Sequence, residues 1–239
     1  MTQAVDISVV IPVYNEAPNI TLLAEEVFTA LEPLGRTWEL VLVDDGSDDE
    51  SPRLLAELSA ANSHLRAVTM SRNSGQSAAL SAGIRAAHGD LLVMLDGDRQ
   101  NDPADIPSLL ALTDKADLVC GYRKNRHDSL VRRVSSRIAN RVRNAVTHDG
   151  VRDTGCSLKA CRRAALLRMP TFNGMHRFLP ALFTIAGYTI VETPVNHRPR
   201  MAGVSKYGIG NRLWKGLSDL YVMAWMRRHW IFQLEEDVK

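Results

Sequence analysis

The chain has 239 residues, of which 45% are apolar and 23% charged, and its formal net charge is +2. These proportions match soluble globular proteins, so they exclude a disordered chain and a chain embedded wholly in a membrane. The length suits one large α/β domain, or one domain with a short appendage, and a sizeable buried core.

Short β-branched runs alternate with helical patterns in the first 120 residues, which predicts βαβ units and a mostly parallel sheet. The expected strands are 7–11, 40–43, 67–70 and 91–95. The expected helices are 20–31, 54–61, 77–87 and 104–112. Beyond Cys120 the alternation weakens, and we expect a strand pair near 157–161 and 189–195 and a helix from Phe178.

The spacing of the cysteines and the length of the apolar runs indicate where in the cell the protein is expected. The three cysteines, Cys120, Cys156 and Cys161, lack metal-type spacing and cannot all pair within one chain, so we expect reduced thiols in a cytoplasmic protein. No secretory signal is visible at the N-terminus. The longest uncharged run, 178–191, is shorter than the roughly 18 to 20 residues of a spanning helix, so we expect no membrane span.

Polar, turn-rich stretches follow three of the predicted strands, at 12–16, 44–49 and 96–102. Ligands in open α/β sheets bind beyond the carboxyl ends of the strands, so we expect these stretches to line one crevice. Helix caps and simple turns are the alternative interpretation of the first two. Their joint placement after consecutive strands favours a binding site.

A pair of carboxylates leaves the sheet edge at Asp96-Gly97-Asp98, with a glycine between them that allows close backbone approach. Such a pair suits a hard divalent cation that also binds phosphate oxygens. Gln100 adds another oxygen two residues later. An ordinary acidic turn is the alternative, and the strand-end context favours the metal site.

Several motifs occur in order along the chain: VVIPVYNE at 9–16, VDDGS at 43–47, DGDRQ at 96–100, DTGC at 153–156, RPR at 198–200 and GVSKYG at 203–208. Together they resemble the family 2 inverting glycosyltransferases, in particular the dolichol-phosphate mannosyltransferase and polyprenyl-phosphate glycosyltransferase branch. The resemblance covers roughly residues 5 to 215. It implies a GT-A fold, which is a Rossmann-like, mostly parallel sheet flanked by helices, here followed by C-terminal amphipathic helices.

The resemblance also implies roles for the loop residues. The expected nucleotide-binding residues are Pro12, Tyr14, Glu16, Asp44 and Asp45. Of the two aspartates, the second is the expected partner of the base. The expected site of Mg²⁺ or Mn²⁺ and of the diphosphate comprises Asp96, Gly97, Asp98 and Gln100. A metal there would neutralise the charge that develops on the leaving nucleoside diphosphate.

Two further segments resemble family loops. The stretch 72–76, which begins with Arg72, resembles a loop beside the nucleotide, although it would serve equally to open the following helix. Gly121-Tyr122-Arg123 resembles a strand end of the family, but tyrosine precedes the arginine and the usual following glycine pair is missing, so we expect the local loop to differ.

Basic residues are concentrated in 123–143, which holds eight of them against one acid. A solvated helix face is one interpretation; the other is an anion site, because arginine forks fit phosphate oxygens. The candidates for phosphate binding are Arg123, Arg132, Arg177, Arg200 and Lys206. The last two lie in a segment that resembles the mobile acceptor loop of the family.

Asp153 falls where the family carries an acid facing the reacting sugar, so it would act as base or as orienting group. A phosphate acceptor is already ionised near neutral pH, so little base strength is required and positioning can dominate. The expected catalytic residues are Asp98, Asp153, Arg200 and Lys206. The seven histidines show no metal-ligand spacing, so we expect surface or structural roles for most of them.

Tryptophans and basic residues alternate near the C-terminus, at Trp214, Lys215, Trp225, Arg227, Arg228 and Trp230. This mixture is typical of a membrane-interface helix, and a terminal helix packed on the core is the alternative.

The sequence therefore predicts a metal-dependent inverting enzyme that moves a hexose from a nucleoside diphosphate sugar, of GDP-mannose or UDP-glucose type, to a polyprenyl (dolichyl or undecaprenyl) phosphate. We expect a catalytic domain over 1–210, with a donor half at 1–121 and an acceptor half at 122–210, and a tail over 211–239 that contacts the inner face of the membrane peripherally. Transfer to a saccharide or other hydroxyl is one alternative. A non-catalytic nucleotide-sugar-binding protein is another, and no nucleic-acid partner is expected.

Overall fold

The computed structural model describes residues 4–124, 143–199, 220–230 and 232. Its named elements, in chain order, are β1 (Ile7–Val13), α1 (Ala17–Leu31), η1 (Glu32–Leu34), β2 (Trp38–Asp44), α2 (Ser51–Ala61), β3 (Leu65–Thr69), α3 (Gln76–Ala86), β4 (Leu91–Met94), η2 (Pro103–Asp105), α4 (Ile106–Leu110), β5 (Leu118–Arg123), β6 (Lys159–Arg162), α6 (Arg163–Leu167), α7 (Met175–Ile185) and β7 (Ile190–Val195).

These strands form one sheet in the order β3-β2-β1-β4-β6-β5-β7. All neighbouring pairs are parallel except those of β6, which runs antiparallel to β4 and to β5. The predicted mostly parallel sheet and its four N-terminal strands are therefore confirmed. The predicted pairing of 157–161 with 189–195 is wrong, because β5 lies between β6 and β7 and uses both as hydrogen-bond partners for its buried backbone.

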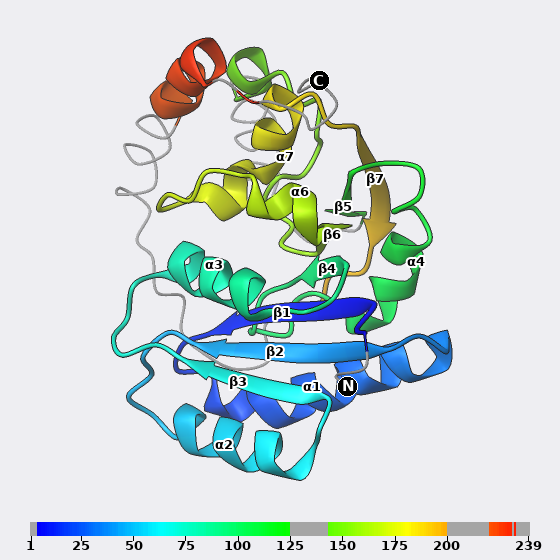
Figure 1. The fold of residues 1–239 in the computed structure, drawn as a ribbon, viewed down its shortest axis with the longest axis vertical. Helices are drawn as coiled ribbons and strands as arrows, with labels where there is room; N and C mark the ends of the chain where they lie inside the picture. Colours follow the sequence, from blue (N-terminus) through cyan, green and yellow to red (C-terminus); the bar gives the residue numbers. More distant parts are fainter. Residues whose placement is uncertain (1–3, 125–142, 200–219, 231, 233–239) are drawn as a thin grey trace.

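Helices cover both faces of the sheet (Figure 1). Successive strand residues point to opposite faces, so Val9 belongs to one buried cluster and Val10 to the other. The first cluster lies under α1 and α4, and the second lies under α3, α6 and α7. The predicted helix over 104–112 is shorter in the structure, where η2 precedes α4, and the helix expected from Phe178 begins at Met175.

The amino ends of the parallel strands carry a polar cluster around Glu39. Ser8 donates its hydroxyl to Glu39 at 2.6 Å, the backbone N–H of His88 donates to the same oxygen at 2.6 Å, and Arg66 lies 3.3 Å from the other oxygen. His64 stacks on Trp38 nearby, with ring centroids 4.2 Å apart. These two histidines therefore have the structural roles that the sequence predicted.

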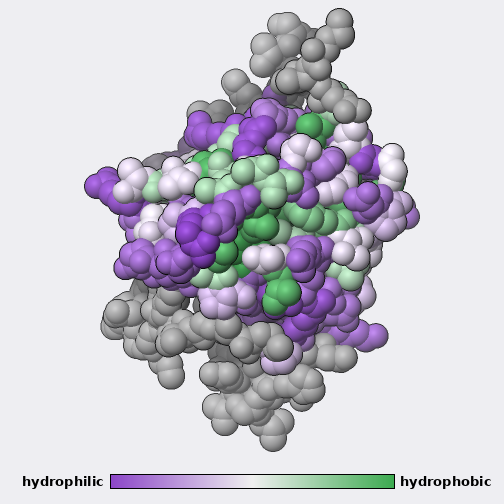
Figure 2. Space-filling model, turned by 90° about the horizontal axis from the view of Figure 1, so that it is seen from below, coloured by the Kyte–Doolittle hydropathy of each residue, from purple (hydrophilic) through white to green (hydrophobic). Residues whose placement is uncertain are grey.

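The end of the molecule formed by α2 and the edge strand β3 is mostly hydrophilic, with smaller hydrophobic areas between the polar ones (Figure 2). All three cysteines are buried and unpaired, and burial raises the pKa of the Cys120 thiol to about 12. A further helix covers 220–229, and its Met223 is buried in the second cluster. None of the helices within the described ranges is long and apolar enough to cross a bilayer.

Candidate active site

The loops after β1 and β2 hold each other at the carboxyl edge of the sheet. The backbone N–H of Asn15 donates to the Ser47 hydroxyl at 2.9 Å, and its side-chain amide donates to Asp48 at 2.6 Å. Glu16, the N-cap of α1, makes no side-chain capping bond. The polar residues of these loops thus fix one loop against the other, and Asp49 also accepts the first backbone N–H group of each following helix.

The loop after β4 packs against the same place. A Cβ atom on Gly97 would lie 3.0 Å from a methyl carbon of Val13 and 3.1 Å from the carbonyl oxygen of Pro12. Any larger residue would push this loop away from the end of β1. The glycine between the two carboxylates therefore allows the close backbone approach that the sequence predicted, and the loops after β1, β2 and β4 meet at one edge.

The two neighbouring aspartates after β2 have different surroundings. Asp45 accepts backbone N–H groups from Ser74 and Gly75, each at 2.8 Å, so its carboxylate organises the loop over 72–75. Asp44 accepts the N–H of Ser47 at 3.0 Å through one oxygen. Its other oxygen is buried and has no hydrogen-bond partner in the described part of the chain. Asp44 is thus the aspartate with an oxygen that no described residue satisfies, whereas each oxygen of Asp45 already accepts one N–H group.

The backbone of the stretch that begins with Arg72 packs closely against Gly46. A Cβ atom on Gly46 would lie 2.5 Å from the carbonyl carbon of Arg72, and the φ of Gly46 is +68°, so only glycine suits this contact. The N-cap of α3 is Gly75, without a side-chain capping bond. The Arg72 side chain itself is exposed at this edge.

The predicted metal residues present oxygen atoms at the end of β4. Asp96 accepts a hydrogen bond from the Gln76 amide at 2.6 Å, and Asp98 accepts the backbone N–H of Gln100 at 3.1 Å. Within the described ranges there is no group of three or more His, Cys, Asp or Glu side chains that would hold a metal. Two carboxylates with phosphate oxygens and water nevertheless form a suitable set for Mg²⁺ or Mn²⁺, so the residues fit the expected ion.

Burial, followed by the neighbouring Asp98 carboxylate, raises the pKa of Asp96 to about 6 in the metal-free protein. The stability associated with the protonated carboxyl is present below pH 3.8 and is lost as the pH rises through about 6. Asp96→Asn keeps the acceptor for Gln76 without the charge. In EDTA at pH 7.5 we expect it to raise the free energy of unfolding by on the order of 1 to 3 kcal/mol.

Urea denaturation of both proteins at pH 5 and pH 7.5 measures this effect. The advantage of the Asp96→Asn variant should shrink at the lower pH, where the wild-type carboxyl is largely protonated. A variant that is less stable than the wild type at pH 7.5 would contradict the raised pKa.

A cavity of about 210 Å³ lies beside Asp96. The starts of α3 and α7 border it, and its lining includes Gln76 of α3 and His176 of α7. Three predicted site residues line it, namely Pro12, Asp96 and Arg177. Gln76 and Thr154, which also line it, fall in the predicted stretches 72–76 and 153–156. The polar lining residues that the sequence did not indicate are Ser157, Lys159 and His176.

His176 is held in this wall by α3. Its Nδ1 lies 2.7 Å from the Ser77 hydroxyl, which also accepts the N–H of Gly174 at 2.9 Å. Because the hydroxyl accepts from Gly174, its own proton is available to Nδ1 of the imidazole. A histidine and an arginine immediately before the helix expected from Phe178 were the sequence signal for this wall, and the structure places both in the first turn of α7.

Asp153 and Arg123 form an ion pair behind the cavity. Nε of Arg123 donates to one carboxylate oxygen at 2.6 Å, and a terminal guanidinium nitrogen donates to the other at 2.8 Å. The same guanidinium nitrogen would lie 3.0 Å from a Cβ atom on Gly155, which lines the cavity. The sequence analysis predicted Asp153 as a base or orienting group and Arg123 as a phosphate-binding residue. In the structure these two side chains are bound to each other.

Five of the predicted residues lie outside the described residues, namely Arg132, Arg200, Lys206, Trp214 and Lys215. Arg198, the first residue of the expected acceptor loop, donates to Glu26 at 2.9 Å and to Asp102 at 2.7 Å. Glu26 also binds Arg99 at 2.5 Å. These contacts tie the start of the expected acceptor loop to the loop of the predicted metal site.

Solved structures with the same fold include glucosyl-3-phosphoglycerate synthase from Mycobacterium tuberculosis. Its complex with Mn²⁺, UDP-glucose and glycerol 3-phosphate is 22% identical, has a TM-score of 0.65 and aligns with 93% of this chain and 79% of its own. Its complex with Mg²⁺ and UDP is 21% identical, with a TM-score of 0.66 and the same coverage. The expected GT-A type fold is therefore confirmed.

Relatives of higher identity are found among bacterial transferases. The undecaprenyl-phosphate 4-deoxy-4-formamido-L-arabinose transferases of Salmonella typhimurium and Salmonella newport are each 42% identical over 203 residues, which is 84% of this chain. The chain spans only 62% of the length of these relatives. Residues 8–169 match the glycosyl transferase family 2 model, and the chain therefore belongs to that family.

Proposed function

We propose that this protein is a metal-dependent inverting glycosyltransferase that moves a sugar from a nucleoside diphosphate to a polyprenyl phosphate. The observation that carries the proposal is a cavity lined by the carboxylate of Asp96 together with the cations Lys159 and Arg177, with the Asp98 carboxylate close to Asp96. Oxygen ligands for a metal beside cations for a phosphate suit a reaction between two phosphate-bearing substrates. Relatives named as undecaprenyl-phosphate transferases support the acceptor class.

The donor occupies the carboxyl edge of the sheet in this proposal. Pro12, Tyr14 and Glu16 bind the nucleoside with Asp44, whose buried oxygen lacks a partner within the described ranges. Asp45 shapes the adjoining loop. Asp96, Asp98 and Gln100 hold Mg²⁺ or Mn²⁺, which when bound neutralises charge on the diphosphate leaving group. We propose a hexose as the transferred sugar, whereas the relatives' name specifies a pentose derivative.

The hydrogen bonds of the Asp153 carboxylate favour a phosphate substrate as the sugar acceptor over a hydroxyl substrate. A hydroxyl group needs a base to remove its proton, but both oxygens of Asp153 accept hydrogen bonds from Arg123. A phosphate is already ionised near neutral pH and needs only to be positioned. Asp153 then acts as a positioning residue that fixes the Arg123 guanidinium beside the cavity wall.

A transfer assay tests the function directly. The purified chain is incubated with Mn²⁺, undecaprenyl phosphate and one donor at a time: UDP-glucose, GDP-mannose or a nucleotide-activated 4-deoxy-4-formamido-L-arabinose. We expect a glycosylated lipid with one donor and none in excess EDTA. A matched reaction with a free saccharide acceptor tests the hydroxyl alternative. Nucleotide binding without transfer to either acceptor would favour the non-catalytic alternative.

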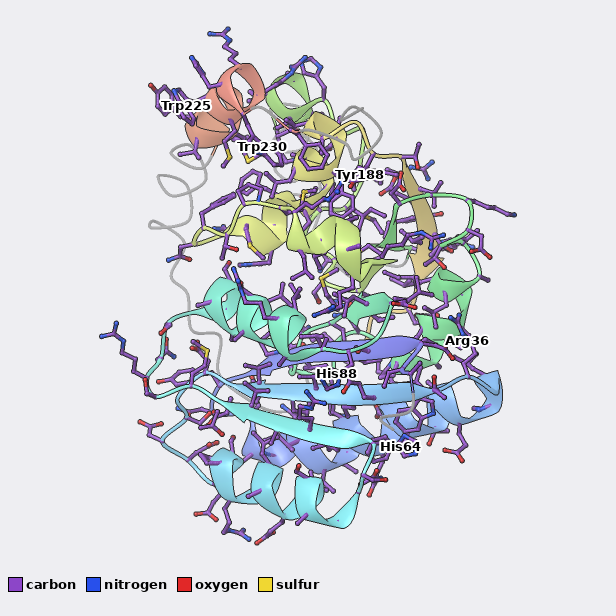
Figure 3. All side chains as sticks on the ribbon, in the orientation of Figure 1. Arg36, His64, His88, Tyr188, Trp225 and Trp230 are labelled. Carbon is purple, nitrogen blue, oxygen red and sulfur yellow. The ribbon has the colours of Figure 1, made fainter. Side chains whose placement is uncertain are left out.

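The proposal also includes peripheral contact with a membrane surface through the helix over 220–229. Its exposed side carries Tyr221 and Trp225, which are 74% and 53% exposed, while Met223 anchors the opposite side in the core. Trp230 differs, because it packs on Phe232 at a centroid distance of 5.4 Å, and Phe232 contacts Tyr188. Figure 3 shows Trp225 at the outer side and Trp230 closer to Tyr188.

This contrast gives a matched pair of variants. We expect Trp225→Ala to weaken co-sedimentation with anionic vesicles several-fold at unchanged melting temperature, because an exposed tryptophan is lost from the lipid contact. Trp230→Ala should lower the melting temperature, because packing against Phe232 is lost. Unchanged sedimentation of the Trp225→Ala variant would show that the exposed side of this helix does not contact the bilayer.

A further inference from the structure

Lys159 is a lysine buried within the sheet, only 2% exposed. It stands in β6 opposite Met94 of β4, and paired residues of antiparallel strands project to the same face. Asp96, two residues after Met94, leaves the strand on that face as well. Lys159 and Asp96 are therefore diagonal neighbours, and both line the cavity of about 210 Å³.

The ammonium group of Lys159 is only partly satisfied by the protein. It has three N–H donors, and its hydrogen-bond acceptor among the described residues is the carbonyl oxygen of Cys156. No carboxylate of the described ranges lies within ion-pair distance of it. A buried cation is costly unless it is paired, and methionine would fill the same space without a charge.

The side chains around the Lys159 ammonium indicate which class of ligand would accept its remaining hydrogen bonds. The cavity also holds His176 and Arg177, so it gathers basic side chains next to the carboxylate of Asp96. It is smaller than the roughly 300 to 1,000 Å³ of a site that encloses a whole small molecule. A charged oxygen-rich group of a larger substrate fits these conditions, and phosphate oxygens are strong acceptors for a lysine point charge.

We propose that Lys159 is a phosphate-binding residue of the transfer reaction, whose ammonium donates to a phosphate oxygen in the cavity beside Asp96. This inference rests on the proposed function, which supplies two sources for that oxygen, the donor diphosphate and the lipid phosphate. In either case the phosphate oxygens of the substrate provide hydrogen-bond acceptors for the N–H groups of Lys159 that the described protein residues do not satisfy. Lys159 would then touch the reacting groups rather than merely fill the core.

Lys159→Met and Lys159→Arg separate this role from a structural one. Titration with UDP or GDP in Mn²⁺ tests the donor diphosphate, and the KM for undecaprenyl phosphate tests the acceptor. We expect the methionine variant either to bind the nucleotide at least about tenfold more weakly or to have a KM for undecaprenyl phosphate at least about tenfold higher. Its melting temperature should be equal to that of the wild type or higher, and the arginine variant should recover part of the lost binding. Lys115→Met, at an exposed turn, is the control and should change neither.

Unchanged affinity and KM in the Lys159→Met variant would overturn the proposal, and a lowered melting temperature with both unchanged would assign Lys159 to folding alone. If the methionine variant does not fold, Lys159→Gln repeats both titrations with a neutral polar side chain. If the wild type glycosylates no lipid phosphate, the proposed function is wrong, while the nucleotide titration still decides whether Lys159 binds phosphate.

Discussion

Replacing Asp98 by alanine is expected to abolish sugar transfer, with a rate loss of at least about 10³-fold. The chain offers two carboxylates at the end of β4 and no larger cluster of metal-binding side chains in its described ranges, so the loss of one leaves the ion poorly held. The charge on the departing diphosphate would then lack its counter-ion. Transfer rates and Mn²⁺-dependent titration of UDP or GDP measure the two effects separately.

Asp114→Ala is the matched control, because Asp114 is an exposed aspartate in the turn after α4. It should keep wild-type rates and nucleotide affinity. The Asp98→Ala variant should also lose the dependence of nucleotide binding on Mn²⁺, which separates a metal defect from a folding defect. Wild-type transfer by the Asp98→Ala variant, or full activity of the wild type in excess EDTA, would remove the metal from the mechanism.

The predicted elements agree with the structure where local sequence patterns decide the fold. The strands β1, β2 and β4 are runs of buried aliphatic residues, and each ends in a turn-rich loop, so both the strands and the edge that holds the site follow from the sequence. The order of β6, β5 and β7 does not, because strand neighbours depend on contacts between distant segments. Nothing local in 189–195 indicates whether its partner is β6 or β5.

The site likewise contains residues that a local motif predicts and residues that only the folded structure reveals. Asp96 and Asp98 stand in a recognisable motif, whereas Lys159 is a single lysine in a short strand whose burial only the assembled sheet reveals. Arg123 and Asp153 were each predicted for a separate role. Their pairing joins residues 30 positions apart, which no spacing rule would indicate.

The Arg123–Asp153 pair provides the second large expected effect. The two side chains are only 16% and 9% exposed, so removing either partner leaves a poorly solvated charge. We expect Arg123→Ala and Asp153→Ala each to lower the free energy of unfolding by about 3 to 5 kcal/mol, and the double variant to lose less than the sum. Arg53→Ala breaks exposed pairs with Glu50 and Glu57 and should cost less than about 1 kcal/mol.

Transfer rates of the same variants decide the role of Asp153. If Asp153 positions Arg123, the two single variants and the double variant should lose similar activity, since each destroys the same unit. If Asp153 were instead the base, Arg123→Ala would retain more activity than Asp153→Ala, because a carboxylate released from a guanidinium accepts a proton more readily. The assays are run well below the melting temperature of the least stable variant, so that unfolding does not contribute. A clear advantage of the Arg123→Ala variant would overturn the positioning role and revive transfer to a hydroxyl acceptor, which is the reaction that requires a base.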